Sequence, residues 1–270
     1  MPELPEVETL RRGLDATVVG KRIESVMVLW RPSFEVAQAR IDAFVTGHRV
    51  TAIRRRGKVL LLGLDDGQHL LVHPKMTGQL VVVEHGTTVF AGGHPSRSML
   101  GPMPNATTRV VFSFSADTVM YFNDQRKFGW IKLVDTGSLA GEEFLSRLGP
   151  EPLSEAFTRR GLRDRLSRHP RAPVKAVILD QSTVAGVGNI YADESLHLAR
   201  IDPRRMAGTL STAEVARLHG AIRTVIGGAV EHGGTSFAGY VNAFRGSTTY
   251  LAQARVFQRA GEPCMTCGTP

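Results

Sequence analysis

The sequence of 270 residues contains only two cysteines, and both lie within its last seven residues. A disulfide framework therefore cannot hold this chain together, and its length supplies enough core for stability without one. The sequence also lacks any apolar run near the ~18 residues that a membrane-spanning helix needs. Its first residues, Met-Pro-Glu-Leu-Pro-Glu, are acidic where a secretory signal would be basic and then apolar. These absences favour a cytoplasmic protein that does not contact a membrane.

Charge of one sign is in excess, but no basic tail carries it. Lys and Arg number 33 against 25 Asp and Glu, for a net charge of +8. Residues 1–135 hold 17 basic and 13 acidic side chains and residues 136–270 hold 16 and 12, so each half contributes +4. A polyanion would therefore contact both halves. The excess of Arg over Lys, 27 to 6, suits bidentate phosphate contacts but is also typical of GC-rich bacterial genomes.

The first half of the chain is a β domain led by a helix. Residues 4–18 place apolar side chains at three- and four-residue steps, which predicts an amphipathic helix. From residue 22 to residue 134, short Val/Ile/Leu-rich runs alternate with Gly, Asp and Asn turns, which predicts an antiparallel sandwich or barrel. Residues 85–108 are rich in Gly, Pro, Ser and Thr and are predicted to form a loop, either functional or a plain surface excursion.

The second half is predicted to be helical. The expected helices are 139–148, 153–166, 174–179, 190–198 and 215–226. Residues 232–257 return to loop and short strand, and the chain ends on Pro-Cys-Met-Thr-Cys-Gly-Thr-Pro. The fold class is therefore α+β. The predicted domains are 1–135, a linker at 136–152 that includes the hinge Gly149–Pro152, a helical domain at 153–231, the loop and strand at 232–257, and a cysteine module at 258–270.

Pro2 and Glu3 are the first candidates for chemistry. Removal of the initiator Met would leave Pro2 with a free secondary amine, and an α-amino group titrates near 8 against 10.4 for lysine. Such an amine is a better carbonyl nucleophile at neutral pH and can form an iminium, or Schiff base. Glu3 could act as general acid or base, with Glu6 one helical turn further on. The alternative is that these residues only begin a helix.

A glycine-rich turn at residues 184–189 is the second candidate. Gly186-Val-Gly-Asn189 directly precedes a predicted helix, so its backbone N–H groups could bind one phosphate with help from the Asn189 side chain. It lacks the third glycine of a dinucleotide fingerprint. A basic run lies upstream, and it is either a solvated helix face or a phosphate track. Its members are Arg159, Arg160, Arg163, Arg165, Arg168, Arg171 and Lys175.

Two further segments, one that contains Arg126 and Phe128 and one that contains Met76, are candidates for DNA contact. In Asn123–Trp130, Arg126 and Phe128 lie two residues apart and are expected to project to the same side. On DNA, Phe128 could wedge between bases while Arg126 reaches into the vacated space, or Phe128 could be strand core. Met76 could likewise be a wedge between bases or a core residue. Cys264 and Cys267 supply two of the four ligands of a zinc site; two more could lie beyond residue 270, or the pair could be redox-active or without function.

Seven segments together resemble the formamidopyrimidine-DNA glycosylases (the MutM proteins) over essentially the whole chain. They are Met1-Pro-Glu-Leu-Pro-Glu-Val-Glu-Thr9, Arg56-Gly-Lys58, His73-x-x-Met-Thr-Gly78, Asp124-x-Arg-x-Phe-Gly129, Gly186-Val-Gly-Asn-Ile-Tyr-Ala-Asp-Glu194, Gly233-Gly-Thr235 and Gly261-Glu-Pro-Cys-x-x-Cys-Gly-Thr-Pro270. The opening octapeptide and the Gly-Val-Gly-Asn segment are the most specific of them.

The resemblance implies a bifunctional DNA repair enzyme, a glycosylase and AP lyase, that removes 8-oxoguanine and formamidopyrimidines. In that scheme Pro2 is the nucleophile, Glu3 protonates the sugar with Glu6 in support, and Lys58 acts from a β-hairpin turn. The iminium then leads to β,δ-elimination. The implied partner is double-stranded DNA with oxidised bases or abasic sites, bound by a monomer associated with the bacterial nucleoid.

The resemblance also assigns DNA contacts. Met76, Arg126 and Phe128 would fill the gap left by the flipped lesion, Lys175 and Asn189 would hold phosphates in a helix–two-turn–helix unit, and residues 233–250 would close over the flipped base. One structural zinc ion, with no organic cofactor, is expected on Cys264 and Cys267 if a second cysteine pair exists.

Two departures from the family pattern bear on these assignments. The family usually has Leu-Gly where this chain has Pro74-Lys75, which adds a charge to the loop that carries Met76. The family also continues into a second Cys-x-x-Cys and a minor-groove arginine. The rival functions are an endonuclease VIII-like glycosylase for oxidised pyrimidines and a non-catalytic damaged-DNA-binding paralogue. The opening octapeptide argues against the first, and the presence of Pro2, Glu3 and Lys58 argues against the second.

Overall fold

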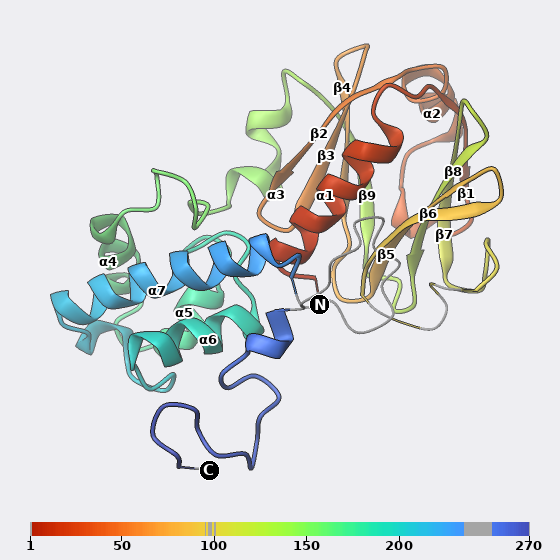
Figure 1. The fold of residues 1–270 in the computed structure, drawn as a ribbon. Coiled ribbons are helices and arrows are strands. Elements are labelled where there is room, and N and C mark those ends of the chain that lie inside the picture. Colours follow the sequence, from red (N-terminus) through yellow and green to blue (C-terminus); the bar gives the residue numbers. More distant parts are fainter. Residues whose placement is uncertain (1, 95, 97–98, 100, 235–249, 270) are drawn as a thin grey trace. The chain divides into compact units, whose positions relative to one another are not determined.

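The computed structural model describes residues 2–94, 96, 99, 101–234 and 250–269 (Figure 1). The chain divides into two compact units, the first formed by the described residues up to Ser146 and the second by those from Arg147 onward. In the first unit, antiparallel strands and a leading helix dominate, and the second is helical. The predicted α+β class is confirmed.

Helix α1 (Leu4–Val18) spans the predicted residues 4–18. Pro5 lies in its first turn, where the missing N–H costs nothing. The Glu6 carboxylate accepts the Glu3 backbone N–H at 2.8 Å and so satisfies a donor at the start of the helix. Its apolar face is buried completely, with Leu4, Val7, Leu10, Leu14 and Val18 each at 0 % exposure.

Two antiparallel sheets make up the rest of the first unit. The five-stranded sheet has the order β1 (Ile23–Val28), β7 (Thr108–Phe114), β8 (Thr118–Asp124), β5 (Gly78–Glu84) and β6 (Thr87–Gly93). The four-stranded sheet has the order β2 (Val50–Arg56), β3 (Val59–Leu64), β4 (Gln68–His73) and β9 (Trp130–Asp135). The short helices of this unit are η1 (Arg31–Ser33), α2 (Gln38–Phe44), η3 (Leu139–Gly141) and α3 (Glu143–Ser146).

One hydrophobic core joins α1 to both sheets. Leu10 and Leu14 of α1 belong to the same buried cluster as Leu62 and Leu70 of the four-stranded sheet and Phe90 of the five-stranded sheet. Figure 1 shows α1, in red, beside β2 and β3, and it also packs against β6. Burial of this shared face is the main source of stability for such a layered unit.

The first unit differs from the sequence-based expectations at three places. Residues 87–93, expected within a loop, form β6, because Thr87, Val89 and Phe90 favour a strand despite their Gly-rich surroundings. The seven-residue helix α2 was not expected, because it buries a single apolar residue, Ile41, and shows little periodicity. The expected helix 139–148 is broken into η3 and α3, with Glu142 extended between them.

The second unit contains the helices α4 (Arg159–Ser167), α5 (Val174–Leu179), α6 (Asn189–Ala199), η4 (Ala207–Thr209), α7 (Thr212–Glu231) and η5 (Tyr250–Gln253). Helix α7 begins with the predicted capping box, in which Ser211 N–H donates to Glu214 at 2.8 Å. Helix α4 begins six residues later than expected, because Thr158 caps it and accepts the Gly161 N–H at 3.0 Å.

The loop expected to close over a flipped base, residues 233–250, lies mostly outside the described residues. Gly233 and Gly234 end the described segment, and Tyr250 resumes it in η5, with its ring tilted against that of Tyr191 and the ring centroids 5.4 Å apart. In the part of the chain that can be described, no helix is long and apolar enough to cross a membrane.

The contact between α1 and β6 gives a test of the shared core. A methyl group at Gly13 would lie 2.0 Å from the Phe90 ring, so Gly13→Ala should force the ring aside and destabilise the first unit by about 1–3 kcal/mol. The matched control is Gly220→Ala on the exposed face of α7, where no described atom lies within 4 Å of the added methyl. Urea unfolding of both variants would measure this, and equal stability would contradict the packing.

Candidate functional site

A buried group of charged side chains lies where α1 begins. Glu3, Glu6 and Lys58 are 2 %, 8 % and 6 % exposed, and Pro2 next to them is also buried. Lys58 occupies the turn between β2 and β3, as expected for a hairpin-turn lysine. Charged groups are rarely buried unless they are paired. This group therefore marks the candidate active site.

The surroundings of Lys58 change its acidity. Burial lowers the pKa of Lys58, the carboxylates of Glu3 and Glu6 oppose this shift, and the Lys75 ammonium adds to it, leaving the pKa below its ordinary value. Both carboxylates are thus near enough to act on Lys58. The structure brings Lys58 to Glu3 and Glu6, from which it is more than 50 residues away in the sequence.

The Glu8 side chain holds the hairpin of β2 and β3 in place against helix α1. One carboxylate oxygen accepts from Arg11 Nε of the same helix at 2.8 Å, and the other accepts from Arg55 Nε of β2 at 3.1 Å. Burial raises the pKa of Glu8, but hydrogen bonds and charge from the two arginines outweigh this and leave it below its usual value. The carboxylate stays ionised, so β2 and its turn keep one position against the start of α1.

The segment that carries Met76 is held by backbone contacts. His73 Nδ1 accepts the Lys75 N–H at 3.0 Å, and Gly78 N–H donates to the Pro74 carbonyl at 2.9 Å. Lys75 has φ +52°, a left-handed conformation that glycine adopts without strain and other residues at a cost of about 1–2 kcal/mol. This chain thus has a lysine at a position where glycine, the family's usual residue, fits the backbone best.

Met76 and Phe128 are surface residues. Met76 is 39 % exposed and Phe128 is 54 % exposed, so neither is the core residue that the sequence left as an alternative. The Arg126 guanidinium lies 5.0 Å above the Phe128 ring, which confirms that the two side chains project together. Large apolar side chains held in water are typical of a binding surface.

In the second unit, the turn between α5 and α6 is fixed by Gln181. Its side-chain amide donates to the Val187 carbonyl at 2.8 Å and accepts from the Gly186 N–H at 2.9 Å. Gly186 has φ +89°, which favours glycine. Asn189 is exposed as the first residue of α6, so its side chain is accessible to an anion at the start of this helix.

Lys175 has a partner that the sequence did not reveal. Its ammonium lies 2.8 Å from the Asp193 carboxylate on α6, which the folded chain brings to α5. The upstream arginines on and beside α4 are mostly exposed, namely Arg159, Arg160, Arg163, Arg168 and Arg171. Lys175, one of the predicted phosphate contacts, is therefore already in an ion pair before any phosphate binds.

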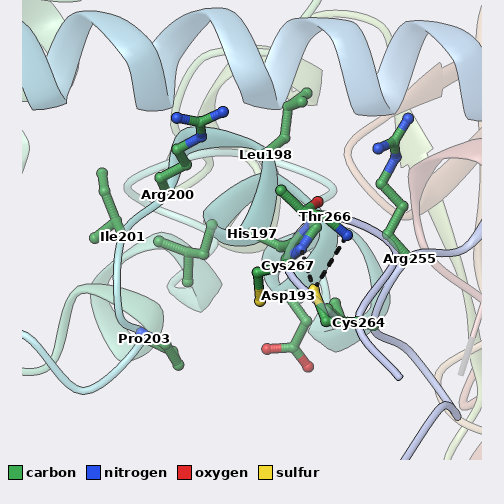
Figure 2. Close-up of a pocket in the computed structure, with 12 residues that line it drawn as sticks. Asp193, His197, Leu198, Arg200, Ile201, Pro203, Arg255, Cys264, Thr266 and Cys267 are labelled. Atoms are coloured by element: carbon green, nitrogen blue, oxygen red, sulfur yellow. Dashed lines mark hydrogen bonds between the residues drawn. The ribbon is translucent and has the colours of Figure 1, made fainter. Parts of the chain in front are cut away.

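The C-terminal segment is attached to α6 at two places. The buried Glu194 carboxylate accepts the backbone N–H groups of Arg255, Val256 and Phe257 at 2.9–3.0 Å. Figure 2 shows Cys264 beside His197, with Cys264 Sγ 3.7 Å from His197 Nε2. No sequence pattern indicates this histidine, because 67 residues separate it from Cys264.

The cysteine pair does not complete a zinc site among the described residues. The Thr266 backbone N–H, then His197, lower the pKa of the Cys264 thiol to about 6, and Cys267 also hydrogen-bonds it. A structural zinc ion needs four ligands. No group of three or more His, Cys, Asp or Glu side chains in the described part of the chain is arranged to hold a metal. The zinc expectation therefore stays a prediction.

Comparison with known proteins identifies the family. Residues 1–131 match the formamidopyrimidine-DNA glycosylase N-terminal domain, and residues 148–240 match the formamidopyrimidine-DNA glycosylase H2TH domain. A formamidopyrimidine-DNA glycosylase of Pelotomaculum thermopropionicum is 40% identical over 99% of this chain and 92% of its own length. The chain belongs to the formamidopyrimidine-DNA glycosylase family.

Solved structures of glycosylases from this family share the fold. The wild-type Lactococcus lactis glycosylase in complex with DNA containing N7-benzyl-Fapy-dG has a TM-score of 0.86 and 29% sequence identity over 99% of this chain and 92% of that one. The Lactococcus lactis glycosylase bound to DNA with an abasic site has a TM-score of 0.85 and 30% identity over the same shares. The predictions of a glycosylase family, its enzyme class and its fold are confirmed.

The buried His73 of this glycosylase gives a pH prediction. Burial, then the Lys75 and Lys58 charges, lower the pKa of His73 to about 3, whereas the unfolded residue titrates near 6.5. Between these values the unfolded state alone binds the proton, so stability falls as pH falls, by about 1.4 kcal/mol per pH unit. Between pH 7 and pH 5, the free energy of unfolding of the unaltered protein should fall by about 2 kcal/mol more than that of His73→Asn. Asparagine is chosen because its side chain keeps an acceptor for the Lys75 N–H.

Urea unfolding at the two pH values measures this difference. The exposed His85 is the matched control, and His85→Asn should lose as much stability as the unaltered protein. Identical pH slopes for His73→Asn and the unaltered protein would reject a neutral buried His73.

Proposed function

We propose that this chain is a bifunctional DNA glycosylase and AP lyase that excises oxidised purines, chiefly 8-oxoguanine and formamidopyrimidines. The observation that carries the proposal is the burial of Glu3, Glu6 and Lys58 beside Pro2. Burial lowers the pKa of Lys58 beside two carboxylates, and perturbed groups of this kind cluster at catalytic sites, where they transfer protons.

The nucleophile in this proposal is the Pro2 nitrogen, freed by removal of the initiator Met. An α-amino group with a pKa near 8 is unprotonated far more often at pH 7 than an unperturbed lysine. Its lone pair attacks C1′ of the damaged nucleotide and the glycosidic bond breaks. The product is an iminium between the sugar and Pro2, from which β- and then δ-elimination cleave the strand.

Glu3 and Lys58 supply the proton transfers. Glu3 directly follows the nucleophile, so its carboxyl group can protonate the sugar ring oxygen as the ring opens. Lys58 lies in the turn that Glu8 and Arg55 hold against α1, and its lowered pKa makes its ammonium a better proton donor to the substrate. Glu6 keeps the backbone of Glu3 in place through the hydrogen bond to its N–H.

The DNA contacts follow from the exposed groups. Removing a base from the stack costs a few kcal/mol, and Met76, Arg126 and Phe128 would offset that cost by filling the gap. Asn189 and Lys175 would bind backbone phosphates at the turn before α6. The Lactococcus lactis complexes with Fapy-dG-type and abasic DNA support this choice of substrate.

Borohydride trapping tests the proposed chemistry. Duplexes with 8-oxoguanine opposite C, thymine glycol or an abasic site are incubated with the protein and borohydride, which reduces an iminium to a stable cross-link. Trapping on 8-oxoguanine is expected. A preference for thymine glycol would indicate an endonuclease VIII-like enzyme, and binding without trapping or nicking would indicate a non-catalytic paralogue.

Pro2→Gly tests the nucleophile itself. Trapping on abasic DNA should fall by roughly 100-fold, because glycine offers only a primary amine on a flexible residue in place of the fixed secondary amine of proline. The matched control is Pro102→Gly, an exposed proline outside the proposed site, which should trap like the unaltered protein. Unchanged trapping by Pro2→Gly would reject Pro2 as the nucleophile.

Salt dependence tests the phosphate contacts. If about four phosphates are neutralised, affinity for an abasic-analogue duplex should fall roughly 100-fold between 50 and 200 mM salt, because counterions released from DNA oppose binding. Fluorescence anisotropy at several salt concentrations gives the slope. Affinity that does not change with salt would contradict the proposed contacts.

A further inference from the structure

Asp124 is a fully buried carboxylate at the end of β8 to which the mechanism above gives no role. It is 0 % exposed, and its cross-strand partner is Gly78 at the start of β5. It lies between the segment Pro74–Gly78, in which only Met76 is exposed, and the exposed segment Gln125–Phe128, which carries Arg126 and Phe128. We call these two the wedge segments.

The two carboxylate oxygens of Asp124 hold both wedge segments. Oδ1 accepts from the Thr77 hydroxyl of the first segment and from the Arg126 N–H of the second, the latter at 3.2 Å. Oδ2 accepts the Gly129 N–H at 2.6 Å. The Arg126 N–H also lies 3.0 Å from Thr77 Oγ1, so the segments contact each other directly at this point.

The backbone of Asp124 is fixed as well. Its N–H donates to the Thr107 carbonyl at 2.8 Å, and its carbonyl accepts from Arg109 Nε at 2.8 Å. Gly129 approaches so closely that an added Cβ would lie 2.6 Å from the Phe122 ring and 3.1 Å from Asp124 Oδ2. A carboxylate with this many partners has one available position.

Buried polar groups are costly unless they are satisfied, so such a network specifies a single arrangement of the groups it joins. Here the network joins the two wedge segments to each other, and their side chains Met76 and Phe128 remain exposed to water. Resting on the function proposed above, we infer that Asp124 is a positioning residue that sets Met76, Arg126 and Phe128 as one unit for filling the gap beside a flipped base.

Asp124→Asn is the sharpest change. One amide oxygen can replace only one carboxylate oxygen, so the amide NH₂ must face either the Gly129 N–H or the donors on Oδ1. Thr77→Val is the second variant, because it removes the hydroxyl bridge at nearly constant volume and leaves the Gly129 contact intact. The matched control is Asp117→Asn, an exposed carboxylate in the turn between β7 and β8.

Two substrates separate positioning from general damage. Excision of 8-oxoguanine from a duplex requires the wedge segments, whereas borohydride trapping on single-stranded abasic DNA does not, because no stack or opposing strand has to be held apart. We expect kcat/KM on the duplex to fall at least 10-fold for Asp124→Asn and about 3-fold or more for Thr77→Val. Trapping on single-stranded abasic DNA should stay within about twofold for both.

The outcomes separate this inference from the proposed function. Duplex excision by either folded variant at the rate of the unaltered protein would overturn the positioning role. An equal loss on both substrates would also overturn it, because damage to the catalytic group would then explain the result. If the unaltered protein neither excises 8-oxoguanine nor traps on abasic DNA, the proposed function itself fails, and the inference fails with it.

Discussion

The position of α1 in the core is the constraint on which the first unit depends. Its apolar face is fully buried against strands from both sheets, and Gly13 allows the Phe90 ring to approach the helix backbone. A helix held this way cannot slide or rotate without opening voids in a close-packed core. Its first residues, Pro2 and Glu3, therefore have fixed places, and the chemistry proposed for those residues depends on packing more than a turn away.

Buried polar groups and exposed apolar side chains have different roles in this unit. Lys58, His73 and Asp124 lie inside, each with its acidity or its hydrogen bonds set by neighbours. Met76 and Phe128 lie outside, where water gives them no partner. Rigid polar interiors hold geometry, and exposed apolar groups gain free energy only when a partner covers them. In the sequence, His73 and Asp124 directly precede the two segments that carry Met76 and Phe128.

Much of this arrangement could be predicted from sequence, and the rest depends on long-range contacts. The periodicity of α1 is a local signal, whereas the hairpin turn at Lys58 is implied by the resemblance to the family, and both predictions are confirmed. The strand β6 was missed because its glycines and threonines resemble a loop until neighbouring strands pair with it. The roles of Asp124 and His197 also could not be predicted. Their partners, Thr77 and Cys264, are 47 and 67 residues away, and no pattern of spacing encodes such contacts.

Lys175 is paired with Asp193 and so presents no free positive charge to a polyanion, and the net charge of +8 already counts both members of this pair. Asp193 acts as a counterion tethered to the protein. When a phosphate displaces it, no mobile ion is released from the lysine, and the freed carboxylate repels the incoming strand. In the proposed complex, a random encounter with undamaged DNA therefore gains little free energy at Lys175. A duplex that other contacts already hold can replace Asp193 with one of its phosphates, so the proposed Lys175 contact favours a correctly placed duplex.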